Sequence, residues 1–423
     1  MGCTYEEALE GLYALARALP PRQYLLGMKR LLKRLGDPQD DFESIIVTGT
    51  NGKGSVTAMT ASALKREGLK TGLYISPHVD DFRERICING GMIQKKRVAE
   101  LYEEVGGKSR AGEQVTFFEF ITSMMFQHFS EEGVDCAVLE VGLGGRLDAT
   151  NVARSRLGAI TGIGLEHMDV LGKTLSSIAR EKAGIARKGG ALVTAEEKKE
   201  PLGVIEKVCM DRQAKLIRVG RDINFNQISC TSERNEYEVG GLNGTYSISL
   251  PMLGAHQGKN AAVAVGLAEL MDAGKKAIER GIGEAKLPCR LEVVSRKPLT
   301  VMDCAHNPQA ARELSRSLGL FDFEKLVLVV GMMRDKDQTG FFRELAPKAD
   351  CLVLNQPDYG RAKPLGELFE IARDSCGKII GIKDVRTSIK IAESLASRDD
   401  LICIAGSIYM LSEARGHKSG VTQ

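Results

Sequence analysis

Tryptophan is absent from this chain, and aromatic residues make up only 5% of it. Proteins that bind nucleic acid by base stacking usually carry more aromatic side chains. The formal net charge is +3 over 423 residues, which is close to neutral and offers no polyanion-binding surface spread over the chain. We therefore expect no nucleic-acid partner, and any phosphate-binding site must be local.

Features that mark membrane and secreted proteins are also missing. No apolar run approaches the roughly 20 residues that cross a bilayer, and the stretch 1–20 carries acidic residues and lacks the long apolar core of a signal peptide. The ten cysteines lie far apart and none falls in a C-x-x-C pair, so no ligand spacing argues for zinc. We expect a cytoplasmic protein with reduced thiols and no membrane partner.

The length of 423 residues favours two or three domains. Continuous apolar runs at 45–47, 137–139 and 326–330 are typical of parallel strands buried on both faces. Amphipathic stretches lie between them, for example 56–65, which is followed by a candidate C-cap at Gly68. This alternation predicts an α/β fold with mostly parallel sheets and helices on both faces.

One stretch breaks this alternation. Residues 223–250 are rich in Asn, Ser, Thr and Gly, which predicts short antiparallel strands appended to the first domain. A helix is expected from Gly258, then a charged link, and the βα alternation restarts near Leu299. We predict a first domain over 1–290 and a smaller, Rossmann-like α/β domain over 291–423.

A glycine-rich loop at 48–55, Thr-Gly-Thr-Asn-Gly-Lys-Gly-Ser, follows a buried strand and opens a helix. Glycines let backbone N–H groups turn toward phosphates, and the helix N-terminus adds partial positive charge. Lys53 supplies a full charge at the β- and γ-phosphates, and the Ser55 hydroxyl can reach Mg²⁺. The context predicts a P-loop-type first domain whose ATP-binding loop residues are Asn51, Gly52, Lys53, Gly54 and Ser55.

The loop departs from the usual G-x-x-x-x-G-K-[ST] pattern, because Val47 stands at the first glycine and Gly54 follows the lysine. A glycine-rich turn with a surface lysine is the alternative, which the coincidence of strand, Gly-Lys and helix disfavours.

A second glycine cluster, 142–145, lacks the third glycine of a dinucleotide fingerprint and is followed by polar Arg146 and Asp148. An NAD site is therefore disfavoured.

Further motifs follow along nearly the whole chain. They are Ser76-Pro77-His78, Glu84-Arg85-Ile86, Ile88-Asn89-Gly90, Thr116-Phe117-Phe118-Glu119-Phe120, 139–151 (LEVGLGGRLDATN), Gly164-Leu165-Glu166-His167-Met168-Asp169, 180–185 (REKAGI), His256-Gln257-Gly258-Lys259-Asn260, Arg290-Leu291-Glu292, 303–308 (DCAHNP) and Asp335-Lys336-Asp337. With the loop at 48–55, their order and spacing resemble folylpolyglutamate synthases and dihydrofolate synthases of the Mur-ligase superfamily. Three departures, Glu166 for a usual Asp, Cys289 for a common Gly and Gln309 for a frequent His, leave the exact substrate open.

The resemblance implies an ATP-dependent ligase that joins L-glutamate to a folate or dihydropteroate carboxylate through an acyl phosphate. Negative charge gathers around the transferring phosphoryl group, so cations and aimed donors are the main catalytic resource. The implied partners are these small molecules alone, and we expect a monomer. Another Mur-type ligase acting on a different pterin or a UDP-sugar acceptor, or a non-ligase P-loop ATPase, stays open as an alternative.

The resemblance also implies a metal site for two Mg²⁺ ions at Ser76, Glu140, His167 and Lys182. Glu140 ends a buried strand, where an unpaired carboxylate is costly and a hard cation fits; pairing with an arginine is the alternative. From periodicity alone Lys182 would be a solvated helix residue. In the family this lysine is carbamylated by CO₂, which makes it an anionic ligand. The predicted catalytic set is Lys53, His167 and Lys182.

In the family, ATP is also held across the domain cleft, which implies roles for Asn260 at adenine, Asp303 at ribose, and Arg290 and His306 near the phosphates. Asp303 could instead cap a helix. The acceptor side is implied for Phe118, Arg146, Asp148 and Ala149, although Phe118 alone would be assigned to the core.

Overall fold

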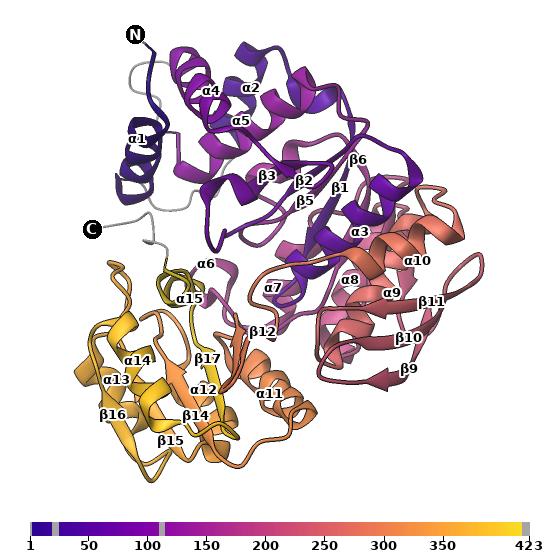
Figure 1. Ribbon diagram of the computed structural model, residues 1–423. Coiled ribbons are helices and arrows are strands. Elements are labelled where there is room, and N and C mark those ends of the chain that lie inside the picture. The colour runs from indigo at the N-terminus through magenta and orange to yellow at the C-terminus, as the bar shows by residue number, and fades with distance from the viewer. Residues whose placement is uncertain (1, 19–24, 110–114, 417–423) are drawn as a thin grey trace.

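The computed structural model describes residues 2–18, 25–109 and 115–416 (Figure 1). Its strands form three sheets, of eight, three and six strands. The large and the six-stranded sheets are mainly parallel, and the small sheet is antiparallel. The predicted α/β fold class with its antiparallel appendage is therefore confirmed.

The eight-stranded sheet is built from β1 (Glu43–Thr48), β2 (Thr71–Tyr74), β3 (Ile86–Ile88), β4 (Gly91–Met92), β5 (Cys136–Glu140), β6 (Ser155–Ile160), β7 (Ala191–Thr194) and β8 (Lys215–Arg218). Their order is β4-β3-β2-β5-β1-β6-β7-β8. Strand β1 pairs in parallel with β5 and β6, whereas β3 pairs antiparallel with β2 and β4. The carboxyl ends of β1 and β5 therefore lie side by side, which is where α/β sheets place their sites.

Helices and short 3-10 turns surround this sheet. They are α1 (Tyr5–Ala18), α2 (Leu26–Leu35), α3 (Lys53–Glu67), α4 (Lys95–Lys108), α5 (Phe117–Glu131), α6 (Met168–Leu171), α7 (Leu175–Ala183), α8 (Lys199–Asp211), η1 (Pro38–Asp40), η2 (Phe82–Arg85) and η3 (Ala149–Val152). Helix α3 ends at Gly68, whose φ of 104° is the left-handed C-cap that the sequence predicts.

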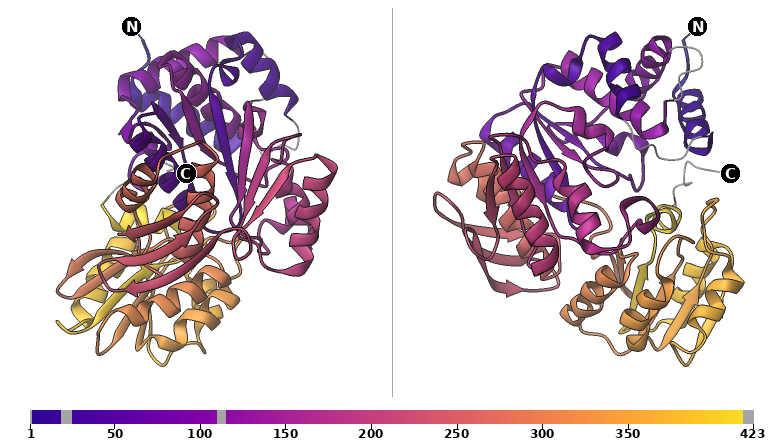
Figure 2. Two further views of the ribbon diagram at one scale, coloured as in Figure 1. Left: turned by 90° about the vertical axis from the view of Figure 1, so that its right-hand side faces the viewer. Right: turned by 180° about the vertical axis from the view of Figure 1, so that it is seen from behind.

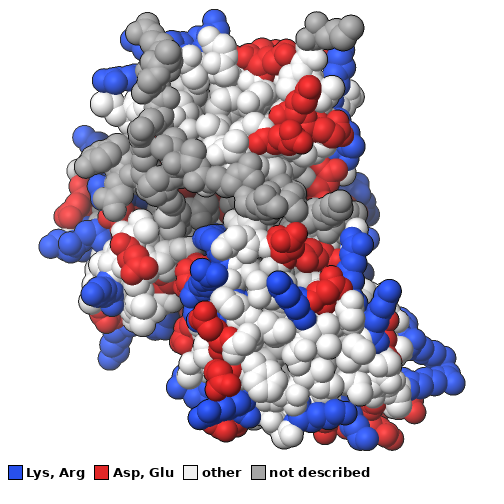
Figure 3. Space-filling view, turned by 90° about the vertical axis from the view of Figure 1, so that its left-hand side faces the viewer, with Lys and Arg blue, Asp and Glu red and all other residues white. Residues whose placement is uncertain are grey.

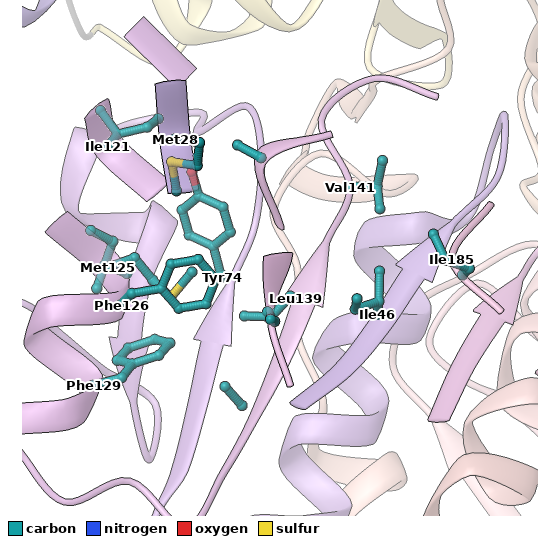
Figure 4. Close-up of a cluster of buried hydrophobic side chains, with 14 of the residues drawn as sticks. Met28, Ile46, Tyr74, Ile121, Met125, Phe126, Phe129, Leu139, Val141 and Ile185 are labelled. Carbon is teal, nitrogen blue, oxygen red and sulfur yellow. The ribbon is translucent and has the colours of Figure 1, made fainter. Parts of the chain in front are cut away.

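Both faces of the sheet are buried, because successive residues of β1 join different apolar clusters. Ile46 packs with Tyr74, Phe126 and Leu139 in a cluster that helix α5 covers (Figure 4). Its neighbour Ile45 lies in a second cluster, with α3, α9 (His256–Glu269) and α10 (Lys275–Glu284). A strand with core on both faces explains the uninterrupted apolar run in the sequence.

The small sheet consists of β9 (Asn224–Cys230), β10 (Asn235–Gly240) and β11 (Thr245–Leu250), in the order β11-β10-β9. Alternate residues of β10, Tyr237 and Val239, point into the cluster shared with α9 and α10. The antiparallel appendage predicted over 223–250 is thus confirmed, and it extends the core of the large sheet.

The C-terminal sheet contains β12 (Glu292–Arg296), β13 (Leu299–Asp303), β14 (Leu326–Val330), β15 (Cys351–Leu354), β16 (Ile379–Gly381) and β17 (Leu401–Ala405), in the order β12-β13-β17-β14-β15-β16. Its helices are α11 (Pro308–Ser317), α12 (Gln338–Leu345), α13 (Leu365–Ala372), α14 (Val385–Leu395), α15 (Ile408–Ala414), η4 (Leu318–Leu320) and η5 (Ala346–Lys348).

The prediction of a charged link before Leu299 was wrong in one respect. Part of this stretch is strand β12, which pairs antiparallel with β13 at the edge of the sheet. Its side chains are partly or fully exposed, so an edge strand of this kind leaves no apolar run in the sequence.

The C-terminal sheet and its helices lie beside the carboxyl edge of the large sheet, and the segment before β12 connects them (Figures 1 and 2). Arg415, just after α15, bridges the two parts: its Nε donates to Asp80 Oδ1 at 2.9 Å and its Nη1 to Glu292 Oε2 at 2.9 Å.

On the face shown in Figure 3, basic and acidic side chains are interspersed. None of the helices in the described ranges has the length and apolarity that a bilayer crossing requires.

Candidate active site

One cavity of about 1120 Å³ lies between the large sheet and the C-terminal sheet. Every site residue predicted from the sequence lines it, with the single exception of Lys182. The lining comes from the ends of β1 and β5, the start of α3 and α9, and the segments after β13 and β17. The fold thus assembles residues from both halves of the chain around one space.

The glycine-rich loop forms the floor of this cavity, between β1 and α3. Gly52 has a φ of 87°, and a Cβ atom there would overlap the side-chain amide of Asn260, so only glycine fits. The Lys53 Nζ donates to the backbone carbonyls of Gly49 and Thr50, at 3.0 and 3.1 Å. The lysine therefore folds over its own loop, with its charge held at the N-terminus of α3.

Glu140 lies next to the loop, at the end of β5, and is only 5% exposed. Burial raises the pKa of its carboxyl, and the positive charge of Lys53, the Ser76 N–H and Arg290 oppose this rise. Its Oε2 accepts the Ser76 backbone N–H at 3.0 Å. The alternative of a salt bridge with arginine is not realised among the described residues, and Oε1 accepts no hydrogen bond from them.

These residues fit a magnesium ion that is bound mainly by phosphate and water. Mg²⁺ usually takes one or two protein carboxylates and keeps several waters. A buried carboxylate in the cavity wall is such a ligand, and Ser55 and Ser76 belong to the same lining. In the described part of the chain, no three His, Cys, Asp or Glu side chains gather in a group that could hold a metal unaided.

Lys182 lies behind the loop, 1% exposed, in the last turn of α7. Its Nζ donates to Glu166 Oε1 at 2.8 Å and to the Gly49 carbonyl at 2.7 Å. Burial lowers the pKa of Lys182 to about 8, although the Glu166 carboxylate works in the opposite direction. The expectation from periodicity alone, a solvated lysine, does not hold, because tertiary packing buries this face of the helix.

His167 follows Glu166 and lines the cavity, with a φ of 45°. Desolvation by the surrounding protein and the positive charge of Lys336 lower its pKa to about 4. The imidazole is therefore neutral at physiological pH, which is the state a metal ligand requires. It lies in the lining with Glu140 and Ser76, the other predicted ligands.

The second half of the chain contributes Arg290, Asp303 and His306. Asp303 does not cap a helix: its carboxylate accepts the backbone N–H groups of Leu291 and Ala305, both at 2.8 Å. The cap of α11 is Asn307, whose side chain also donates to Asn51 Oδ1 of the phosphate loop at 2.9 Å. Burial lowers the pKa of His306 to about 4. The two halves are thus in direct contact beside the loop.

The predicted acceptor residues are arranged around the loop that follows β5. Phe118 packs against Gly142, where a Cβ atom would lie 2.5 Å from the ring. Asp148 caps η3 and accepts hydrogen bonds from Leu143 N, at 2.9 Å, and from Thr150. Arg146 is held by a salt bridge to Glu181 at 2.9 Å. Asp148 therefore shapes the wall, and Ala149 lines the cavity beside it.

Sequence reasoning assigned no role to Arg85, which also lines the cavity. It is 7% exposed, and its Nε donates to His78 Nδ1 at 2.8 Å. The guanidinium lies over the rings of Phe117 and Phe82, 5.6 and 6.0 Å from their centroids. Its terminal nitrogens make no ion pair with a described carboxylate. The Glu-Arg-Ile motif was a visible signal, but only the fold shows that this arginine faces the cavity.

Comparison with known proteins agrees with this arrangement. The Mur ligase middle domain matches residues 47–268, and the glutamate ligase domain of Mur ligases matches 289–408. A protein from Halobacterium salinarum named "Probable bifunctional folylpolyglutamate synthase/dihydropteroate synthase" is 35% identical over 97% of this chain. This chain spans only about half of that protein, 51%.

Other relatives match over almost their full length. The dihydrofolate synthase/folylpolyglutamate synthase of Bacillus subtilis is 32% identical over 92% of this chain and 93% of its own. A crystal structure of the bifunctional Yersinia pestis enzyme, complexed with AMPPNP and a Mn ion, is 30% identical with a TM-score of 0.87, over 98% of this chain and 99% of the other. The chain therefore belongs to the Mur ligase family, in its branch of folylpolyglutamate and dihydrofolate synthases.

Proposed function

We propose that this protein uses ATP to join L-glutamate to the carboxylate of a folate-type acceptor, with release of ADP and phosphate. The observation that carries this proposal is that one cavity brings the phosphate loop, buried Glu140 and Arg290 of the first domain together with Asp303 and His306 of the second. The family, its glutamate ligase domain and the names of its relatives support the same reaction.

An amide forms only from an activated carboxylate. The γ-phosphoryl group passes from ATP to the acceptor carboxylate, and the glutamate amine then displaces phosphate as the C–N bond forms. Lys53 and the first N–H groups of α3 stabilise the charge that gathers on the transferring group. Arg290 would add a second cation beside the loop, where its Nη2 lies near Gly54, and Asn260 and Asp303 would hold adenine and ribose.

Magnesium, when bound, would neutralise negative charge on the phosphate oxygens while the phosphoryl group passes from ATP to the acceptor. Glu140, Ser76 and His167 are the residues we propose to hold it. The neutral imidazole of His167 and the free oxygen of Glu140 suit that role. Two ions would need more negative charge than one carboxylate supplies.

We propose that Lys182 supplies that charge as a carbamate. Only the neutral amine reacts with CO₂, and burial favours the neutral form of this lysine. Its ion pair with Glu166 must open for the reaction, since the ammonium is the form that Glu166 stabilises. Mass spectrometry under mild conditions would detect the added CO₂, and Lys182→Arg, which keeps the charge, should remain unmodified and inactive.

We propose that Phe118, Arg146, Asp148 and Ala149 border the acceptor, and we add Arg85 as the residue that binds an acceptor carboxylate. Arg85 is held rigidly by His78 and two aromatic rings, and its terminal N–H groups lack a protein carboxylate. A preorganised guanidinium of this kind suits a carboxylate ligand.

We also keep the boundary near residue 290 as a proposal. A fragment over 1–290 should fold, because both apolar clusters of the large sheet lie within it. It should make no product, because Asp303 and His306 are missing. Circular dichroism and a ligation assay would test both points, and product formation at full rate by the fragment would refute the shared site.

The proposed reaction is tested by incubating the full chain with Mg-ATP, labelled L-glutamate and one acceptor at a time. The acceptors are dihydropteroate, a tetrahydrofolate monoglutamate and a UDP-sugar peptide. Glutamylated pterin product with equimolar ADP supports the proposal. Product only from the UDP-sugar would indicate another Mur-type ligase, and ATP hydrolysis that no acceptor alters would indicate a non-ligase ATPase. Light scattering on the same sample would test the expected monomer.

A further inference from the structure

Two cysteines lie side by side at the junction of the two halves. Cys289 directly precedes Arg290, and Cys304 directly follows Asp303. The backbone N–H of Cys304 donates to the carbonyl of Cys289 at 2.9 Å. Standard backbone dimensions then keep their Cα atoms within roughly 7 Å, which is inside the limit for a disulfide.

The two cysteine side chains also lie in the same part of the structure. Cys289 is fully buried in an apolar cluster with Val329 and Ile404, and Cys304 packs against that cluster. Each thiol has the other as the largest influence on its pKa, and no disulfide joins the two cysteines. Cys304 is only partly buried and lines the nucleotide side of the cavity, so a small oxidant in the cavity can reach it.

Cys289 stands in a backbone conformation that side chains avoid. Its φ of 55° lies in the left-handed region, which glycine adopts freely and cysteine does not. Glycine would therefore satisfy the fold at this position. Glycine would lack only the short CH2–SH side chain, which packs in the apolar cluster.

The environment favours reaction at Cys304 rather than at Cys289. The hydrogen bond from Cys289 lowers the pKa of the Cys304 thiol, and the Arg290 guanidinium lowers it further, against the effect of burial. The same hydrogen bond and burial raise the pKa of Cys289. The thiolate is the nucleophile in oxidation chemistry, so Cys304 attacks first and Cys289 resolves the product.

We propose that Cys289 and Cys304 form a site of reversible oxidation that weakens nucleotide binding when the disulfide closes. With hydrogen peroxide, the Cys304 thiolate takes one oxygen as the O–O bond breaks, which gives a sulfenic acid and hydroxide. The Cys289 thiol then displaces that oxygen, an S–S bond forms, and water leaves with the Cys289 proton. Two thiols lose two electrons and peroxide becomes water.

The expected effect of the disulfide on nucleotide binding follows from the residues next to Cys289 and Cys304. Arg290 interacts with Cys304, and Arg290 also donates to the Cys289 carbonyl at 3.2 Å. Asp303 holds Leu291 across the same junction at 2.8 Å. A disulfide takes the Cys304 sulfur away from its interaction with Arg290 and constrains the two flanking segments. This effect rests on the nucleotide role proposed above for Arg290 and Asp303, whereas disulfide formation does not.

The test uses the reduced full-length protein, treated with hydrogen peroxide and analysed by intact mass and peptide mapping. We expect a loss of about 2 Da, two hydrogens, and one cross-linked peptide that joins Cys289 to Cys304 and disappears with dithiothreitol. ADP affinity, measured by calorimetry, should fall about tenfold as one charged contact is lost and should recover on reduction.

Cys289→Gly is the informative variant, because glycine fits the backbone and should preserve the fold. It and Cys304→Ser should show neither the cross-link nor the peroxide-dependent loss of affinity. Cys376→Ser, which removes a partly exposed thiol elsewhere, should behave like the unaltered protein. Absence of the cross-link, or an equal loss of affinity in Cys289→Gly, would overturn the proposal. Reduced protein that binds no ADP would instead refute the proposed function.

Discussion

Lys182 and Glu166 form a buried ion pair, with 2.8 Å between Nζ and Oε1 and side-chain exposures of 2% and 9%. The same Nζ donates to the Gly49 carbonyl, so the pair is tied to the phosphate loop. Burial raises the pKa of Glu166, but the charges of Lys182 and Lys53 outweigh it and lower the value to about 2. Glu166 and Lys182 are thus both charged at neutral pH, and the lysine is close to losing its proton.

The first prediction concerns CO₂ uptake by Lys182. Since the lysine pKa is about 8, labelled carbamate should increase as pH rises through that value. Glu166→Gln should move the midpoint to lower pH, because the carboxylate that favours the ammonium is gone. Carbon-13 NMR with labelled bicarbonate would measure it, and Lys182→Arg is the control without a signal. A midpoint that the Gln variant does not shift would contradict the role of the pair.

The second prediction concerns acid stability. The pKa of Glu166 is lower in the folded protein, about 2, than its ordinary value of 4.5. Between these values the unfolded chain binds more protons, so this carboxylate stabilises the fold above about pH 4.5 and loses its effect as pH falls toward 2. Glu166→Gln should lower the free energy of unfolding by about 3 kcal/mol at pH 6. Urea titrations should show this difference shrinking steadily down to pH 3.

The third prediction concerns the loop. Lys53→Ala should lower the ligation rate about a thousandfold, because a cation at the transferring phosphoryl group is lost. The midpoint of thermal unfolding should hardly move, since the side chain bonds only to loop carbonyls. Lys65→Ala, in the exposed last turn of the same helix, is the matched control and should keep full activity. Near-normal turnover by Lys53→Ala would remove the basis of the loop assignment.

The fourth prediction separates the acceptor from the nucleotide. In Gly142→Ala the new methyl group meets the Phe118 ring, which must move. The acceptor KM should therefore rise about tenfold, as for a displaced packing residue, while ADP affinity stays unchanged. Gly203→Ala, in helix α8 with open space around it, should alter neither quantity. An effect on ADP alone would place Phe118 outside the acceptor site.

The fifth prediction concerns contact between the halves. Arg415→Ala removes the bridge between Asp80 and Glu292 and should lower turnover several-fold, because the cavity needs both halves in place. The free energy of unfolding should change by only about 1 kcal/mol, as for ion pairs that keep some contact with solvent. Arg415→Lys should not restore turnover, since lysine cannot make the same forked contacts. Arg373→Ala, which loses a local pair with Glu370, is the control.

Much of the architecture could be predicted from the sequence, because its signals are local. The apolar runs that became β1, β5 and β14, the Gly-Lys loop before α3, and the polar stretch that became the small sheet each show their structure within a few residues. The order of the motifs was also sufficient to identify the family. The roles of individual site residues remain predictions, although all but Lys182 line one cavity.

What the sequence could not determine depends on contacts between distant segments. Strand β12 has no apolar run because it lies at a sheet edge. Lys182 is buried because α7 packs behind the loop at Gly49, a residue 133 positions away in the chain. Arg85 faces the cavity, and Cys289 meets Cys304, only once the sheets have assembled. Burial, pairing and pKa depend on the surroundings of a side chain, and those surroundings exist only in the folded chain.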